Sequence, residues 1–259
     1  MKPVIDSHIH LDLYDRNERE QILRELPLYQ VDSLLAVSFH LSSCLQTLSY
    51  KHPSIKHALG YHPEQALPET KELEAITELI RNNRSTIVAI GEVGLPYYTD
   101  HGDMKNYAAL LEHFIKLAKE LQKPVILHAI YEGADIACDL LEKHEVTDAH
   151  FHWFKGSEQT LDRMKKKGYR ISVTPDCVYE QEIQSIIEHY PIELLMVETD
   201  GPWQFEGKYE GQLTHPKMIH DSIATIAQIK HLPIDRVYEI MYKNTKHFYK
   251  LDAPEKGNR

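Results

Sequence analysis

The chain has 259 residues, of which 42% are hydrophobic and 26% charged, and this composition is that of a globular protein with a substantial core. Its formal net charge of −10 argues against a generally basic surface that would bind nucleic acid, although a bound divalent cation can supply positive charge locally. No run reaches the ~18 apolar residues of a membrane span, no secretory leader is visible, and Cys44, Cys138 and Cys177 lack metal-type spacing, so we expect a reduced, cytoplasmic protein without membrane contact.

Apolar, β-branched runs alternate with amphipathic stretches along the chain. The runs predict eight strands, at Pro3–Asp6, Ser33–Ser38, Lys56–Gly60, Ile87–Glu92, Val125–His128, Asp148–His152, Tyr169–Val173 and Leu194–Glu198. Helical periodicity between them is clearest over Glu72–Arg81, Met104–Leu121, Ala134–Lys143, Glu158–Lys167 and Glu180–His189. Such alternation indicates βαβ units and a parallel sheet.

Eight βαβ units in about 250 residues predict an α/β fold, a (β/α)8 TIM barrel, regular or distorted. The alternative is an open doubly wound sheet, but no G-x-G-x-x-G follows the first strand. We expect a single domain over residues 1–252 and a polar tail over residues 253–259.

His8 and His10 follow the first predicted strand. Residues two apart on a strand point the same way, so the two imidazoles aim at one point. Imidazole is a common ligand for divalent metals. For this pair alone, surface decoration is the more frequent explanation, because the chain has 17 histidines.

Metal-type residues also follow most of the other predicted strands. The strand ends carry His62, Glu92, His128, His150 with His152, and Glu198 with Asp200. A barrel places its active site at the carboxyl ends of its strands. A buried histidine or carboxylate is costly unless it is paired or bound to metal, so this recurrence predicts a metal centre. His62 is open to another interpretation, since it either contacts substrate or shapes the turn with Pro63. Glu198 either ligates metal or supports the site from behind.

Two metals fit this set better than one. The six strongest candidates are His8, His10, Glu92, His128, His152 and Asp200, and one tetrahedral zinc needs only three or four protein ligands. Glu92 is the natural bridge between metals ~3.5–4 Å apart, which would lower the pKa of a bound water from 15.7 toward ~7. Asp200 would ligate and also accept the proton of the attacking water. Mixed ligands of this kind suit Zn, Mn, Mg, Fe, Co or Ni.

These residues lie in stretches that make the chain resemble the TatD family of metal-dependent hydrolases. The stretches are Asp6-Ser7-His8-Ile9-His10-Leu11-Asp12, Ala58-Leu59-Gly60-Tyr61-His62-Pro63, Ala89-Ile90-Gly91-Glu92-Val93-Gly94-Leu95, Pro124-Val125-Ile126-Leu127-His128, His152-Trp153-Phe154-Lys155-Gly156-Ser157 and Glu198-Thr199-Asp200-Gly201-Pro202. They occur in the family's order, and Glu239 to Phe248, with Asn244, looks like its final helix. The resemblance implies a binuclear site and, most often, deoxyribonuclease activity. It assigns His8, His10 and Asp200 to one metal, His128 and His152 to the other, and Glu92 to the bridge.

The chain departs from the family's pattern where substrate would bind. The stretches Ala129-Ile130-Tyr131, Gly94-Leu95-Pro96 and Thr214-His215-Pro216 stand where Ser-Arg-Asp, Gly-Leu-Asp and Asn-Glu-Pro are usual. The family's Arg at this place is a phosphate contact, and we expect Lys155, which stands where a Ser is usual, to restore it. We expect His62 to contact substrate as well, unless it only shapes its turn.

We therefore expect a metal-dependent hydrolase acting on DNA or another phosphodiester, a TatD-like deoxyribonuclease using a metal-activated hydroxide. The missing Arg favours an alternative, a binuclear hydrolase of an amide, ester or lactone. A non-catalytic interaction protein on a barrel scaffold is the third interpretation. Aromatic residues near the rim either stack on bases of single-stranded DNA or pack the loops; they are Tyr97, Tyr98, Trp153, Phe154 and Trp203.

Overall fold

Eight parallel strands lie side by side in chain order in the computed structural model, which describes residues 1–99 and 102–251. They are β1 (Val4–Ile9), β2 (Val31–Ala36), β3 (Ile55–Leu59), β4 (Ile87–Gly94), β5 (Val125–His128), β6 (Ala149–Phe151), β7 (Arg170–Val173) and β8 (Leu195–Val197). The tail predicted for residues 253–259 lies outside the described residues.

The sheet closes into a (β/α)8 barrel, as predicted, but its last seam is irregular. Each strand from β1 to β7 forms a parallel ladder with the next one, up to β8. The first and last strands are joined beyond the end of β8, where the Asp200 N–H donates to the His8 carbonyl at 3.0 Å and the His10 N–H donates to the Gly201 carbonyl at 2.8 Å. This seam places the segment after β8 directly beside the two histidines of β1.

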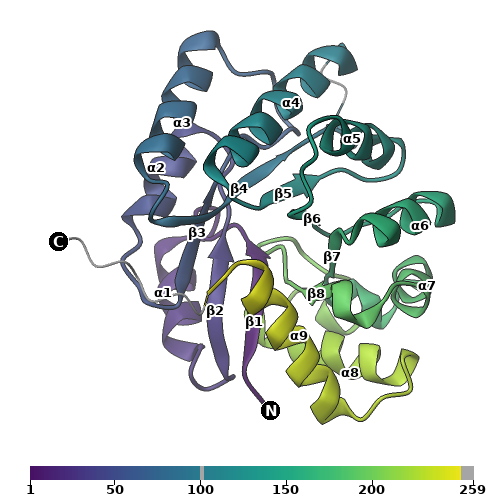
Figure 1. Cartoon of the computed structure of the whole chain (residues 1–259). Coiled ribbons are helices and arrows are strands. Elements are labelled where there is room, and N and C mark those ends of the chain that lie inside the picture. Colours follow the sequence, from purple (N-terminus) through teal and green to yellow (C-terminus); the bar gives the residue numbers. More distant parts are fainter. Residues whose placement is uncertain (100–101, 252–259) are drawn as a thin grey trace.

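Helices surround the strands on the outside of the barrel (Figure 1). They are α1 (Arg16–Glu25), α2 (Leu41–Ser49), α3 (Thr70–Asn82), α4 (Met104–Leu121), α5 (Glu132–Lys143), α6 (Glu158–Lys167), α7 (Gln181–His189), α8 (Ile219–Ile229) and α9 (Ile234–Phe248). The predicted bounds of α4 and α6 match the structure, those of α5 and α7 differ by one or two residues at the start, and α3 is longer than predicted by two residues at its start and one at its end. Both α4 and α6 start at a side-chain cap, from Asp103 and Ser157.

A compact set of side chains fills the interior of the barrel. It takes residues from six strands and from the end of α9; they are Ile5, Leu35, Val37, Ala58, Ala89, Ile126, Met196, Phe248 and Tyr249. A larger core lies between the strands and the helices. The barrel is therefore packed, and a site can form only at its rim.

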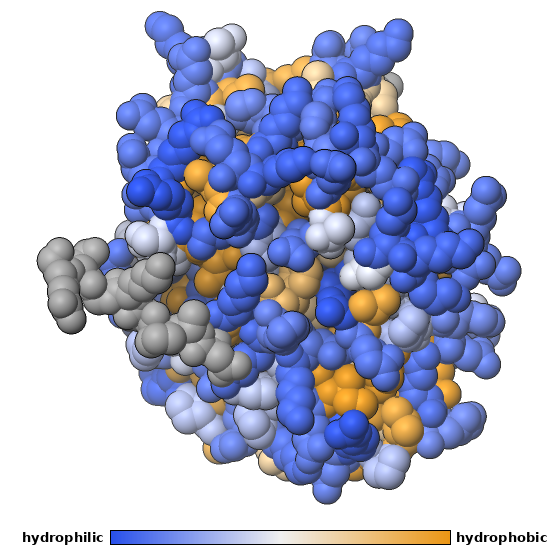
Figure 2. Space-filling view, in the orientation of Figure 1, coloured by the Kyte–Doolittle hydropathy of each residue, from blue (hydrophilic) through white to orange (hydrophobic). Residues whose placement is uncertain are grey.

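Hydrophilic residues cover most of the face seen in Figure 2, and apolar residues gather in separate patches. Among residues 1–99 and 102–251, no helix is both long and apolar enough to cross a bilayer.

Candidate metal centre

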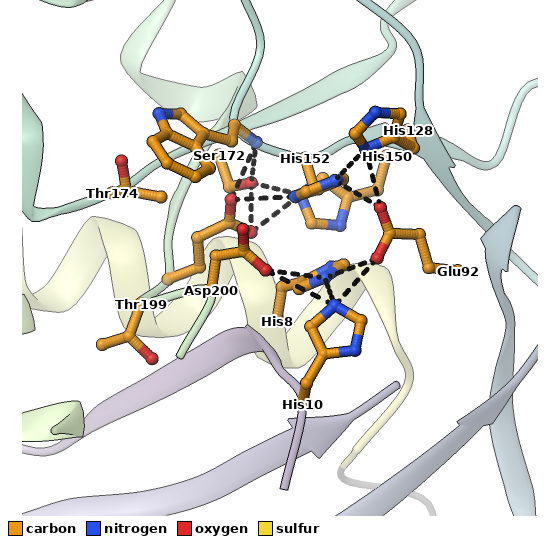
Figure 3. Close-up of polar contacts among 12 residues, drawn as sticks. His8, His10, Glu92, His128, His150, His152, Ser172, Thr174, Thr199 and Asp200 are labelled. Carbon is orange, nitrogen blue, oxygen red and sulfur yellow. Dashed lines mark hydrogen bonds and ion pairs between the residues drawn. The ribbon is translucent and has the colours of Figure 1, made fainter. Parts of the chain in front are cut away.

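The six predicted ligands converge at the carboxyl ends of the strands (Figure 3). His8 lies in β1, Glu92 in β4 and His128 at the end of β5. His10, His152 and Asp200 lie just beyond β1, β6 and β8. All are buried except Asp200, whose side chain is 13% exposed.

Glu92 stands between two groups of histidines. Its Oε2 atom lies 3.0 Å from His8 Nε2 and 3.1 Å from His10 Nε2. Its Oε1 atom lies 3.0 Å from His128 Nδ1 and 2.6 Å from His152 Nε2. Figure 3 shows the carboxylate between the two pairs. Each oxygen of one carboxylate thus faces its own pair of imidazole nitrogens, as a bridging ligand must.

Asp200 completes the group on the β1 side of Glu92. Its Oδ1 atom lies 3.3 Å from His8 Nε2 and 3.5 Å from His10 Nε2. The residue has a φ of 48°, and this left-handed conformation directly after β8 is rare outside glycine, asparagine and aspartate.

The protonation of these groups in the metal-free chain shows how strongly the site favours cations. Burial opposes ionisation of Glu92, yet the neighbouring positive histidines, His152 foremost, hold its pKa well below its usual value. Burial and the charge of His152 oppose protonation of His8, but Glu92 and Asp200 outweigh them and raise its pKa to about 9. Protons therefore occupy places where metal ions would bring positive charge.

The donor set fits divalent metals. Glu92 Oε2 is buried and accepts no hydrogen bond, although two imidazole nitrogens lie close to it. Ligand atoms of His8, His10 and Glu92 lie within 4.8 Å of one another, and so do those of His62, Glu92 and His128. Glu92 belongs to both groups, so two ions could share it.

A buried network of polar side chains supports His152 from behind. Its Nδ1 atom lies 3.4 Å from Glu198 Oε1, and Glu198 Oε2 accepts from the Ser172 hydroxyl at 2.6 Å. Ser172 lies 2.6 Å from His150 Nε2, and His150 Nδ1 lies 2.6 Å from the Tyr249 hydroxyl. Glu198 thus orients a candidate ligand, while also lying within 4.8 Å of ligand atoms of His8 and His152.

His62 faces the same centre from the loop after β3. Its Nε2 atom lies 3.4 Å from Glu92 Oε1, and its ring stacks on Phe39 at 4.4 Å between centroids. Its Nδ1 atom accepts the Glu64 backbone N–H at 3.1 Å. Burial lowers its pKa. In the neutral ring the proton is then on Nε2, which can donate toward the pocket.

The sequence interpretation missed Glu64, whose carboxylate lies 3.0 Å from His128 Nε2. No pattern marks this residue, because it stands in an irregular loop between β3 and α3. The only local sign is its place two residues after His62.

A pocket of about 550 Å³ opens above these side chains. Its lining residues are His10, Leu13, Phe39, His62, Glu64, Tyr98, His128, Ile130, His152, Trp153, Asp200, Pro202, Trp203 and Gln204. Among the described residues, no Lys or Arg lines it. Lys155 lies just outside, with its Nζ 5.5 Å from the centre of the Trp153 ring. Phe154 is fully buried in the core, so it cannot stack on a substrate.

The profile of the TatD related DNase family matches residues 5–250. The chain belongs to the TatD family. An uncharacterized metal-dependent hydrolase from Haemophilus influenzae is 36% identical over 256 residues, which cover 96% of this chain and 100% of the relative. The human deoxyribonuclease TATDN3 is 28% identical over 265 residues, which cover 96% of this chain and 95% of the relative. The crystal structure of YjjV, a TatD homologue from Escherichia coli, matches with a TM-score of 0.86 and 24% identity. The match covers 97% of this chain and 98% of YjjV.

This TatD-family protein is a metal-dependent hydrolase, which removes the non-catalytic interpretation. The departures noted in the sequence fall at different distances from the centre. Ile130 forms part of the pocket wall. Thr214 and His215 are buried and do not line the pocket, and the His215 Nδ1 atom accepts the Lys217 N–H. The retained residues therefore form the floor of the pocket, whereas one altered residue forms its wall.

Proposed function

We propose that this protein hydrolyses phosphodiester bonds of DNA with two divalent metal ions, in the manner of a deoxyribonuclease. The observation that carries the proposal is the placement of Glu92, whose two oxygens face two separate histidine pairs. His8, His10 and Asp200 would hold one ion, and His128 and His152 the other. Metals bound there would supply a Lewis acid and lower the pKa of a water molecule.

The chain's own residues have distinct tasks in this proposal. Glu92 keeps the two metal positions at a fixed separation. Burial opposes ionisation of Asp200, but hydrogen bonding to His8 and the charges of nearby histidines keep its pKa below its usual value. Asp200 is therefore an ionised carboxylate at neutral pH, placed to accept a proton at the pocket floor. His62 donates from Nε2 to a phosphate oxygen.

Metal analysis combined with a substrate panel tests the proposal. Protein saturated with Zn or Mn should contain about two ions per chain, since six ligand-type residues converge where one ion needs three or four. With Mn or Mg, it should cleave single-stranded DNA and a small phosphodiester. A reproducible content of one ion, with all six residues intact, would refute the binuclear site.

A second candidate function is hydrolysis of an ester, lactone or amide at the same centre. It is favoured by the pocket walls, because no Lys or Arg lines the described part of the pocket and several walls are apolar. Phosphate recognition usually employs Arg or Lys near the phosphate. Turnover of a lactone or ester, with no cleavage of any phosphodiester, would replace the first proposal by this one.

The cysteines support a cytoplasmic location. Cys44, Cys138 and Cys177 are all free and buried. Unpaired, buried cysteines are typical of reducing compartments. Detection of the native protein in a cytoplasmic fraction would test the location.

A further inference from the structure

Glu64 is held by more hydrogen bonds than a surface carboxylate usually makes. Its Oε1 atom accepts the backbone N–H groups of Tyr97 at 2.6 Å and Tyr98 at 3.0 Å. Its Oε2 atom accepts the Thr99 N–H at 3.0 Å and the Thr99 hydroxyl at 2.5 Å. The fifth contact joins Oε1 to His128 Nε2 at 3.0 Å. The side chain is only 11% exposed, so these contacts replace its hydration.

The contact with His128 determines which nitrogen of that ring faces the metal centre. His128 Nε2 points at Glu64, whereas Nδ1 points at Glu92 and lies 3.3 Å from His152 Nε2. An ionised carboxylate only accepts hydrogen bonds, so the Nε2 atom must carry a proton. A metal ligand needs an unprotonated nitrogen, and Glu64 leaves Nδ1 as that atom.

Glu64 is poorly placed to be a ligand itself. Both oxygens already accept from five donors on His128 and the 97–99 loop. A metal ion bound to either oxygen would have to displace those donors and leave buried N–H groups unpaired. The role that fits this geometry is orientation of a ligand.

The same carboxylate fixes part of the pocket wall. Tyr98 lines the pocket, and its ring centre lies 6.1 Å from that of His128. The loop that carries Tyr98 is tied to Glu64 through three successive backbone N–H groups. One side chain from the loop after β3 therefore connects a candidate metal ligand at the end of β5 with a wall residue after β4.

We propose that Glu64 is a positioning residue that fixes His128 with Nδ1 toward the metal position that it shares with His152, called the second site. Through the same carboxylate, Glu64 holds Tyr98 in the pocket wall. The position of His8, His10 and Asp200 is called the first site. The proposal rests on the binuclear site proposed above. If it is correct, metal affinity at the second site and substrate affinity in the pocket both depend on Glu64, which touches neither the metal nor the reacting atoms.

The central test is Glu64→Gln, compared with Glu72→Gln as a matched control. Glu72 also accepts a backbone N–H, from Leu41 at 3.3 Å, and among the described residues no hydrogen bond or ion pair joins its carboxylate to a histidine. Stepwise Zn titration of the metal-free protein against a competing chelator measures the Zn affinity of each site. Glu64→Gln should weaken the second site about 10- to 100-fold and leave the first site unchanged, because loss of an orienting partner has effects of that size. Glu72→Gln should match wild type at both sites.

Two other results of the titration would overturn the proposal. Unchanged affinity at both sites in Glu64→Gln would show that the carboxylate does not position His128. A content of one ion per chain in Glu64→Gln at saturating Zn, with two in wild type, would make Glu64 a ligand rather than a positioning residue. Thr99→Val, which removes only one hydroxyl donor, separates the two halves of the claim. It should raise KM without changing metal affinity, and an equal loss of metal affinity would assign the effect to the loop instead of His128.

A nuclear magnetic resonance measurement distinguishes failure of this inference from failure of the proposed function. Wild-type protein labelled with ¹⁵N at histidine should show a proton on His128 Nε2 that is absent or rapidly exchanging in Glu64→Gln. If wild type binds only one ion per chain, the binuclear proposal fails, whereas the Nε2 proton still reports on Glu64. An unprotonated Nε2 in Zn-loaded wild type would contradict the inference directly.

Discussion

The floor and the walls of the pocket are built by different means. On the floor, His8 and Glu92 are completely buried, and strand ends hold the ligand-type side chains in place. On the walls, Tyr98 and Trp203 are 59% and 55% exposed and belong to loops. The floor residues also match the TatD pattern, while Ile130 in the wall does not. The difference indicates that the barrel fixes the reaction and that its loops choose the substrate.

Close packing explains why the floor tolerates so little change. A side chain added at Gly94 would collide with the His128 carbonyl, since β4 and β5 approach closely there. Any larger residue at this position would separate the strands that carry Glu92 and His128. Tyr98 and Trp203 in the wall have no such restriction, because these exposed side chains can be replaced without moving a strand.

Asp200→Asn should have the largest effect, because it changes the floor. The amide is nearly isosteric but is a poor ligand and cannot accept the proton. We expect kcat to fall about 10²- to 10⁴-fold at saturating metal, the range for loss of a general acid or base. The melting temperature should stay near that of wild type. Turnover at the wild-type rate would remove Asp200 from the catalytic role and weaken the contrast between floor and wall.

Metal affinity should depend on pH through the floor alone. The pKa of His8 is raised to about 9, so its proton must leave before a metal binds. Affinity should therefore rise by about tenfold per pH unit per displaced proton up to about pH 9, with protons released to the buffer. Calorimetry in buffers of different ionisation enthalpy measures that release. The stability of the metal-free protein should change with pH in the opposite direction. The contribution of His8 to that stability is complete below pH 6.5 and is lost as the pH rises through about 9.

Trp203→Ala should affect substrate binding more than turnover, because it changes a wall. A base stacked on an aromatic side chain is worth about 1–3 kcal/mol, and half-exposed Trp203 belongs at the lower end. We expect KM for single-stranded DNA to rise about fivefold to tenfold with little change in kcat. A large loss of kcat with unchanged KM would show that wall and floor are not separable.

Lys155→Ala should have the smallest effect. Lys155 lies outside the pocket against Trp153, so we propose that it contacts a phosphate beyond the one at the metals. The substitution should raise KM for a long single strand about twofold at low salt, as expected for one surface cation. A small phosphodiester should be cleaved equally by both proteins. Equal KM for the long strand would remove Lys155 from substrate binding.

Residues that repeat a strand-end pattern were predictable from the sequence. His8 and His10 were visible as a pair, and the buried run Val125–His128 placed His128 correctly. Other boundaries were hidden by tertiary contacts. The first strand was expected to end at Asp6, but β1 continues to Ile9. Asp6 is accommodated inside the barrel because the Thr199 N–H and hydroxyl donate to its carboxylate.

Residues that act across the barrel could not be predicted in this way. Glu64 reaches donors 33 to 64 residues later in the chain, and nothing in its own neighbourhood indicates those partners. The irregular seam between β1 and β8 depends likewise on backbone atoms that have no sequence signature. Patterns of residue type report which face of an element is buried, whereas long-range polar contacts follow only from the assembled fold.

The hydrogen bond between Tyr249 and His150 has a consequence for how the protein is made. The two residues are 99 positions apart, and every candidate ligand precedes Tyr249 in the chain. During synthesis the histidines of β1 therefore leave the ribosome long before the residue that completes the support of His152. A nascent or truncated polypeptide that ends before Tyr249 contains all six ligand-type side chains. It lacks the last of the buried polar residues that support His152.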